Sequence, residues 1–227
     1  MNHNPQQIDM PYASCPNKRD SRTETIIKTY QNHYNATEIP DHKQYWAICG
    51  PCCHNEGTLD IGCEPHQLVE SGLITPSQFH GIEIQEKIHN LNKTVNNGMH
   101  WYLGDFYNTM VAYSCDNTFD PAIVNADLLF MPKLASQYAS KILLFLATVN
   151  KEEMMVVCNF IAEHRYFRSN MDEMMKCLER EPTFQAAFTS AKWSIHPEYY
   201  WYDGTTKENH RGRSTRMMTA IFFKEKS

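Results

Sequence analysis

Short apolar runs alternate along this chain with segments in which apolar residues recur every three or four positions. The runs typical of strands occupy residues 45–49, 58–61, 78–84, 99–103, 121–129, 153–161, 198–202 and 216–224. Helical spacing of apolar residues occurs at residues 21–38, 65–73, 85–96, 106–113, 134–149 and 170–179. The pattern therefore predicts strands and helices in alternation, followed by two strands with no long helix between them.

Strands that alternate with helices build parallel βαβ units, and the two closing strands predict an antiparallel edge. We therefore expect an α/β fold, a doubly wound, mostly parallel seven-stranded sheet with an antiparallel C-terminal edge pair. Residues 1–44 are predicted to form a flexible tail and a helical extension, and residues 45–227 the sheet domain. Doubly wound sheets bind ligands at the carboxyl ends of their strands, so candidate functional residues are those that follow each strand.

Composition narrows the class of protein. The chain has 227 residues, of which 42% are hydrophobic and 21% charged, which excludes a wholly disordered protein. A net charge of −5 argues against a broad basic face for nucleic acid, although not against a local patch. The sequence shows neither a signal-peptide pattern nor an apolar run of about 18 residues, so we expect a soluble, cytoplasmic protein with no membrane partner. Eight cysteines, two of them adjacent at Cys52 and Cys53, are expected to be reduced thiols.

The segment Leu59-Asp60-Ile61-Gly62-Cys63 resembles the opening of the glycine-rich loop in class I S-adenosylmethionine-dependent methyltransferases. The resemblance implies that Asp60, Gly62 and the following Glu64 lie beside S-adenosylmethionine, although Glu64 stands where the family has another glycine. A second interpretation places the first strand at residues 45–49, which have the better strand propensity. Gly50 would then be the close-approach residue, with an enlarged loop after it. Both interpretations remain open at this point.

The next two strand ends continue the resemblance. Phe79-His80-Gly81-Ile82-Glu83 is similar to the family's second strand, whose terminal acid accepts hydrogen bonds from both ribose hydroxyls, a role that suits a carboxylate. Asp105 follows the third strand, where the family's acid meets the adenine amino group and the next residue, here Phe106, packs on the ring. The alternative for Glu83 is a surface acid, and the alternative for Asp105 is a helix N-cap.

The fourth strand ends near Asp127, in a pattern similar to the one before the catalytic loop of methyltransferases that modify exocyclic amino groups. Asp127 and Phe130 match the ends of that D-P-P-Y loop, but Leu128 and Leu129 replace both prolines. The resemblance implies methyl transfer in which Asp127, or Asn125, positions the acceptor nucleophile or takes its proton. The rival is a catalytically inactive relative that kept the fold for binding. No G-x-G-x-x-G follows any strand, which argues against a dinucleotide dehydrogenase.

Two further clusters carry alternatives. Cys49-x-x-Cys52 and Cys63-x-x-His66 have zinc-type spacing, which would suit a zinc-stabilised nucleic-acid-binding protein. We expect no metal, because cysteine is also common in buried strands. The loop at 207–216 is basic, and Arg211, Arg213 and Arg216 are its candidate phosphate contacts. Nucleic acid is therefore the favoured acceptor, ahead of a small molecule or a protein.

Overall fold

The computed structural model describes residues 16–48, 63–96, 98–116, 118–128, 132–149, 153–164, 167–168, 180, 182, 185–186, 193–195, 200–203 and 216–224. Its helices are α1 (Pro16–Tyr34), α2 (Glu64–Glu70), α3 (Glu86–Val95), α4 (Phe106–Tyr113) and α5 (Pro132–Val149), with a 3-10 turn at Pro76–Gln78. Its strands are β1 (Gln44–Ile48), β2 (Phe79–Glu83), β3 (His100–Leu103), β4 (Pro121–Asp127), β5 (Met154–His164), β6 (Phe167–Arg168), β7 (Trp193–Ile195), β8 (Tyr200–Asp203) and β9 (Arg216–Lys224).

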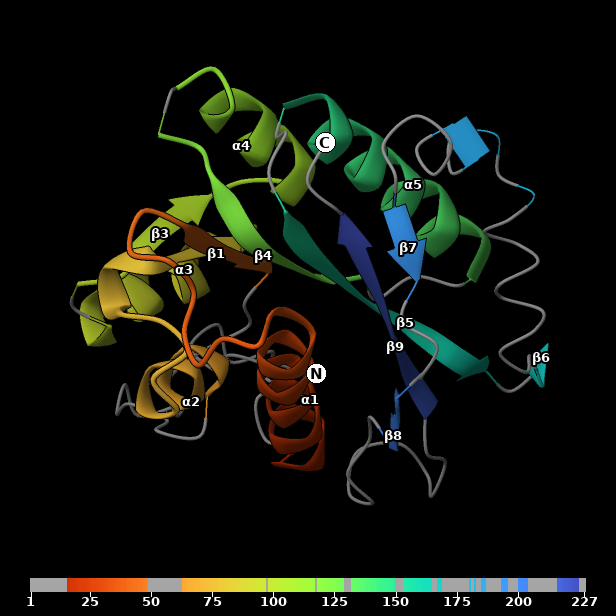
Figure 1. The fold of residues 1–227 in the computed structure, drawn as a ribbon, viewed down its shortest axis with the longest axis horizontal. Helices are drawn as coiled ribbons and strands as arrows, with labels where there is room; N and C mark the ends of the chain where they lie inside the picture. Colours follow the sequence, from red (N-terminus) through yellow and green to blue (C-terminus); the bar gives the residue numbers. More distant parts are fainter. Residues whose placement is uncertain are drawn as a thin grey trace, which may run out of the picture.

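The strands form one twisted sheet with the order β3-β2-β1-β4-β5-β9-β7 (Figure 1). Strands β1 to β5 are parallel to one another, whereas β9 runs antiparallel between β5 and β7. The short strands β6 and β8 add to the sheet by pairing with β5 and β9. The predicted seven-stranded, mostly parallel sheet with an antiparallel C-terminal edge is therefore confirmed.

The first strand is Gln44–Ile48, in the centre of the sheet. Its residues pair in parallel with β2 on one side and with β4 on the other, so that Ala47 faces both Gly81 and Asn125. Of the two interpretations, the one that makes residues 58–61 the first strand is wrong, because Gln44–Ile48 occupies the position between β2 and β4. Residues 58–61 themselves lie outside the described residues. The strand propensity of the Tyr-Trp-Ala-Ile run decided the register, and the motif match at 58–62 did not.

Helices cover both faces of the sheet. Because βαβ crossovers are right-handed, the steps from β1 to β2 and β3 place α2 and α3 on one face, and the return through β4 and β5 places α4 and α5 on the other (Figure 1). Helix α1 joins the face of α2, where Ile26 and Tyr30 pack into the same core as Leu68. The predicted division of the chain at residues 44 and 45 remains a prediction.

The C-terminal pairing agrees in part with the sequence. Strand β8 forms the expected hairpin with β9, in which Tyr200 faces Thr219. Strand β7, which the sequence analysis missed, pairs with the other half of β9, where Trp193 faces Lys224. The helix predicted at 170–179 lies outside the described residues. No helix within the described ranges is long and apolar enough to span a membrane.

Two aromatic rings lie close against the backbone of Gly81 in β2. A Cβ at this position would lie 2.5 Å from Cζ3 of Trp101 and 2.9 Å from Cε1 of Phe79, so both rings occupy the space that a side chain would need. We expect Gly81→Ala to lower the free energy of unfolding by about 1–3 kcal/mol through overpacking. Chemical denaturation of the variant would measure this loss.

The double variant Gly81→Ala/Trp101→Leu separates a local clash from a general loss of packing. Removing the indole opens the space beside position 81. The double variant should therefore lose less unfolding free energy than the sum of the losses in the two single variants. Strictly additive losses would contradict the clash.

Candidate functional site

Glu83 ends β2 at the carboxyl edge of the sheet. Its side chain is 7% exposed, and its Oε1 accepts a hydrogen bond from the backbone amide of Gln85 at 2.8 Å. Its backbone carbonyl accepts the amide of Gly104 at 3.0 Å, which links the ends of β2 and β3. The predicted second-strand acid is therefore a buried carboxylate at a strand end.

Burial governs the charge of this carboxylate. Desolvation raises the pKa of Glu83 above its ordinary value, while the backbone amides of Gln85 and Ile84 and the nearby His89 lower it in part. Holding the ionised form here costs folding free energy, because the raised pKa means that the folded state favours the protonated form. A buried, destabilised carboxylate at a strand end marks a candidate ligand site.

Two large apolar side chains are exposed beside Glu83. Ile84 is 72% exposed, and Leu103, which faces Glu83 across β2 and β3, is 49% exposed. The sequence analysis missed both, although for Ile84 an apolar residue directly after a strand-end acid was the available signal. A buried acceptor flanked by exposed apolar surface suits a ligand that has hydroxyl groups and a flat apolar part.

Asp105 lies at the end of β3 and caps α4. Its Oδ1 accepts the backbone amide of Asn108 at 2.9 Å, and its Oδ2 accepts the hydroxyl of Tyr138 from α5 at 2.9 Å. The N-cap alternative is thus confirmed, and each oxygen retains a lone pair for a further donor. Gly104, with a φ of +155°, makes the turn that brings Asp105 to the helix start.

The residue after Asp105 points into the protein. Phe106 is 4% exposed and packs in the core beneath α4 and α5 with Met110 and Val124. Its expected contact with an adenine ring remains a prediction. Ile84 and Leu103 provide the exposed apolar surface at this end of the sheet instead.

A chain of buried hydrogen bonds crosses the carboxyl half of the sheet. The Oε1 of Glu64 accepts the Tyr45 hydroxyl at 2.7 Å and the amide of Asn125 at 2.8 Å. Asn159 donates to Oδ1 of Asn125 at 3.0 Å and accepts the Thr219 hydroxyl at 2.6 Å. These hydrogen bonds connect the four strands β1, β4, β5 and β9 with α2.

This chain occupies two of the predicted site residues. Glu64 is 4% exposed and Asn125 is fully buried, and each uses its side chain within the protein. Their roles in binding the cofactor and in catalysis stay predictions, which the observed contacts do not favour. Asp127, two residues beyond Asn125 on the same face of β4, is half-buried at the strand end.

The segment after Asp127 departs from the proline-rich loop of amino-directed methyltransferases. The backbone amide of Leu128 donates to the carbonyl of Asn159 at 2.9 Å, and its side chain is 1% exposed. A proline could not make that hydrogen bond. The pairing of β4 with β5 therefore requires a residue with an N–H at position 128, which Leu128 has and a proline lacks.

Several predicted residues lie outside the described part of the chain. These are Gly50, Asp60, Gly62, Cys49, Cys52, Arg211 and Arg213, and the side chain of Arg216 is not described either. Gly50 follows the last residue of β1 by two positions, so β1 leads toward the predicted loop. Of the remaining zinc candidates, Cys63 is a buried free thiol and Nε2 of His66 lies 2.8 Å from Oδ1 of Asn96. Among the described residues, no group of three side chains could hold a metal ion.

Comparisons with known proteins identify the class of fold. No protein-family model matches the chain, and no curated protein matches its sequence. Among solved structures, the plantazolicin methyltransferase BpumL, in complex with a pentazolic desmethylPZN analogue and S-adenosylhomocysteine, is similar over 94% of this chain and 87% of its own, with 12% identity and a TM-score of 0.53. A Pyrococcus horikoshii protein described as a candidate RNA methyltransferase matches over 88% and 82%, with 11% identity and a TM-score of 0.50.

These likenesses define the protein by its fold. The chain has the fold of class I S-adenosylmethionine-dependent methyltransferases, including the antiparallel strand inserted before the sheet edge. At identities this low, the likeness extends to the fold alone.

Thr219 tests the buried chain of hydrogen bonds. We expect Thr219→Val to lower the free energy of unfolding by about 1–2 kcal/mol, because Oδ1 of the fully buried Asn159 loses its hydroxyl donor at nearly constant volume. Denaturant unfolding measures the change. The matched control is Thr148→Val, which removes an exposed hydroxyl bonded to the carbonyl of Phe145 and should cost no more than about 0.5 kcal/mol. Equal losses in the two variants would show that the buried hydrogen bonds stabilise the fold no more than an exposed one does.

Proposed function

We propose that the protein is an S-adenosylmethionine-dependent methyltransferase. The observation that supports this most directly is Glu83, a buried carboxylate with a raised pKa at the end of β2, beside the exposed side chains of Ile84 and Leu103. A ribose supplies two hydroxyl donors for the carboxylate, and an adenine ring covers apolar surface. The fold, which the methyltransferase BpumL shares, agrees with this proposal.

The residues present fit such a cofactor at the carboxyl edge. Glu83 would accept the ribose hydroxyls, Ile84 and Leu103 would contact the adenine, and Asp105, held by Tyr138, would accept the adenine amino group. When bound, the cofactor supplies an electrophilic methyl group on a sulfonium. The protein's part is to hold the acceptor nucleophile in line with that methyl group, and proximity provides most of the acceleration.

Asp127 is the candidate for orienting the acceptor. It ends β4 at the same edge as Glu83, and its pairing with Asn159 fixes the strand there. A carboxylate at this position can accept a proton from the nucleophile or a hydrogen bond from it. Asn125 lies one step deeper, fully buried between Glu64 and Asn159. Asp127 is therefore the stronger candidate of the two.

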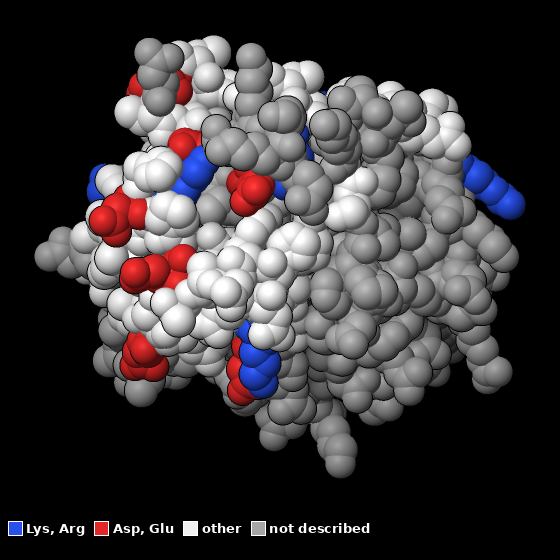
Figure 2. Space-filling view, viewed as in Figure 1, with Lys and Arg blue, Asp and Glu red and all other residues white. Residues whose placement is uncertain are grey.

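We propose two acceptor classes, nucleic acid and a small molecule. The similar structures include a candidate RNA methyltransferase and a protein that acts on plantazolicin. On the face shown in Figure 2, acidic and basic side chains of the described residues are interspersed. The basic loop at 207–216 favours nucleic acid, whereas Leu128 argues against transfer to a base amino group through a proline-rich loop.

The second candidate function is a non-catalytic binding module of the same fold. Leu128 at the expected catalytic loop and the internal use of Glu64 favour it. A module of this kind would bind the cofactor without transferring the methyl group. Mass analysis of candidate acceptors after incubation with isotopically labelled S-adenosylmethionine separates the two functions.

Glu83→Gln should raise stability and weaken cofactor binding. Glutamine keeps the acceptor for the Gln85 amide and removes the buried charge. Because burial raises the pKa of Glu83, the ionised wild type is penalised at neutral pH. The variant should therefore melt at a higher temperature than wild type at pH 7, and the difference should vanish below about pH 4.5, where the wild-type carboxyl is protonated in both states. Calorimetry should show that the free energy of binding S-adenosylhomocysteine becomes less favourable by roughly 1–3 kcal/mol.

The two readouts distinguish a binding role from a structural one. A variant that is more stable yet binds the cofactor as tightly as wild type would remove Glu83 from the site. A folded wild type whose melting temperature does not rise with S-adenosylmethionine or S-adenosylhomocysteine would overturn the proposed function.

Nucleic-acid binding by the basic loop is tested by its salt dependence. If Arg211, Arg213 and Arg216 contact phosphates, the logarithm of the association constant for single-stranded RNA or DNA should fall with the logarithm of salt concentration with a slope of about −2 to −3. Replacement of all three by alanine should flatten that slope. Association that is independent of salt, or none at low salt, would favour a small-molecule acceptor.

A further inference from the structure

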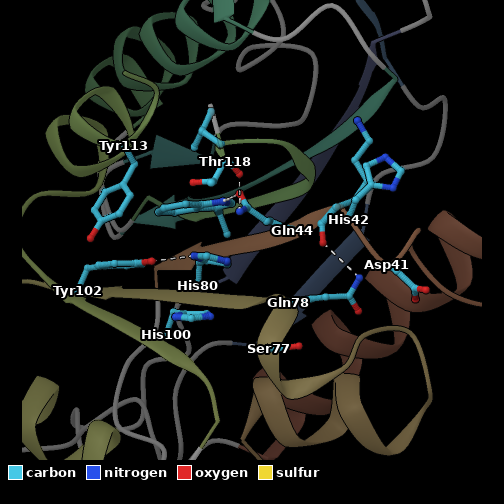
Figure 3. Close-up of a pocket in the computed structure, with 13 residues that line it drawn as sticks. Asp41, His42, Gln44, Ser77, Gln78, His80, His100, Tyr102, Tyr113 and Thr118 are labelled. Carbon is cyan, nitrogen blue, oxygen red and sulfur yellow. Dashed lines mark hydrogen bonds between the residues drawn. The ribbon is translucent and has the colours of Figure 1, made fainter. Parts of the chain in front are cut away.

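A pocket of about 310 Å³ opens at the amino edge of the sheet, opposite to the candidate cofactor edge. Its position follows from the residues that line it, because Gln44, Gln78 and His100 stand at the beginnings of β1, β2 and β3 (Figure 3). Besides the exposed His42, the rings of the lining belong to Trp46, His80, His100, Tyr102, Tyr113 and Phe119. Nothing in the proposed methyl transfer uses this pocket.

The rings of the pocket form an ordered stack. Trp46, His80 and His100 face one another across β1, β2 and β3, with ring centroids 4.5 and 4.7 Å apart and planes within about 20°. Nδ1 of His80 lies 2.9 Å from the hydroxyl of Tyr102, and the planes of these two rings are almost parallel, at 14°. His80 therefore lies between Trp46 and His100 in the stack, and Tyr102 is hydrogen-bonded beside it.

The stack is fixed before any ligand arrives. The indole N–H of Trp46 donates to Oε1 of Gln44 at 2.9 Å, while the amide nitrogen of Gln44 donates to the carbonyl of Thr118 at 2.7 Å. Tyr113 and Phe119 pack on Trp46 at inclined angles of 56° and 57°. A rigid aromatic wall loses little conformational freedom on binding, which favours affinity.

One polar atom of this wall lacks a partner. His80 is 7% exposed, and among the described residues its Nε2 has no hydrogen bond, whereas Nδ1 has Tyr102. Figure 3 shows this second nitrogen on the side of the ring that is turned away from Tyr102. Because this nitrogen is open to solvent, a ligand that displaces the water around it has to supply a hydrogen bond of its own.

The pocket carries little net charge. The ammonium group of Lys43 is paired with the carboxylate of Asp120 at 2.5 Å, and Asp41 and His42 are exposed at the rim. Burial, together with the neighbouring His100, lowers the pKa of His80 to about 3, so its imidazole is neutral at physiological pH. The site therefore suits an uncharged ligand.

We propose that this pocket is a second binding site, specific for an uncharged planar heteroaromatic ring of nucleobase size that lies against the aromatic stack and hydrogen-bonds to Nε2 of His80. Rings in proteins prefer partners that stack, and a pocket of this volume accepts a nucleoside but not a much larger ligand.

The hydrogen bond selects for a ring edge with both a donor and an acceptor. Because a tyrosine hydroxyl can donate or accept, Tyr102 allows either tautomer of His80, so Nε2 can present an N–H or a lone pair. An edge that carries an amide or amidine group satisfies both states, as in adenine or uracil. Indole, which has similar area and only a donor, satisfies one.

The test uses adenosine and uridine as probes and the Trp46 indole signal as a site-resolved readout. The chain has four tryptophans, so a ¹⁵N-indole spectrum is simple and Trp46→Phe assigns the signal. We expect both nucleosides to shift the Trp46 signal saturably and indole to bind more weakly. His80→Phe keeps the ring and removes the hydrogen bond, and should weaken nucleoside binding by about 3- to 10-fold.

A second variant covers failure of His80→Phe to fold. His100→Ala replaces an exposed ring at the edge strand, and should weaken binding about fivefold or more through lost stacking. Glu83→Gln is the matched control, because it alters the opposite edge of the sheet and should leave the Trp46 titration unchanged. This control also separates the second site from any adenosine bound at the cofactor edge.

The outcomes decide the proposal and the source of the ring. An eight-nucleotide single strand that binds more tightly than the nucleosides, with the same loss in His100→Ala, identifies a nucleic-acid base, and equal or weaker binding identifies a free small molecule. An unmoved Trp46 signal at about 10 mM nucleoside, or affinities equal to wild type in both folded variants, overturns the second site. Neither result bears on whether S-adenosylmethionine binds.

Discussion

The buried hydrogen bonds from Thr219 through Asn159 and Asn125 to Glu64 are the constraint on which the rest of the fold depends. Each buried amide has to be satisfied, so the relative registers of β9, β5 and β4 can hardly shift by one residue without leaving a polar group unpaired. This series of hydrogen bonds reaches Glu64, the first residue of α2. It therefore fixes where α2 begins, directly after the segment predicted to hold the cofactor.

The carboxyl and amino edges of the sheet carry different kinds of site, because the strands and helices end at different places. At the carboxyl edge, polar side chains such as Glu83 and Asp105 meet because parallel strands end together. At the amino edge, α4 spans only Phe106–Tyr113, about 12 Å of helix, and ends at Tyr113 beside the aromatic stack. The stack of Trp46, His80 and His100 thus lines an open pocket instead of lying beneath a continuous helix.

The alternation of periods in the sequence predicts most of this fold, because local pattern dictates where strands and helices form. It fails where the evidence is short or non-local. Strand β7 has three residues and is defined only by its partner β9, and the motif at 58–62 resembled a first strand more than the true one did. The role of Asn125 was equally beyond prediction, since its partners Glu64 and Asn159 lie 61 and 34 positions away. By contrast, the acid after β2 and the cap on α4 were predictable from their local context.

Glu83 and its neighbours show where the fold gives up stability. A carboxylate that is desolvated in the folded state opposes folding, and Ile84 and Leu103 leave 72% and 49% of their surface exposed, so they offset little of that cost. All three occur together at the ends of two adjacent strands, a place that the register of β2 with β3 makes rigid. A ligand that donates to the carboxylate and covers the two apolar side chains would remove both costs at once. A site that is unfavourable for the protein alone is therefore well prepared for its ligand, because the unfavourable terms become binding free energy.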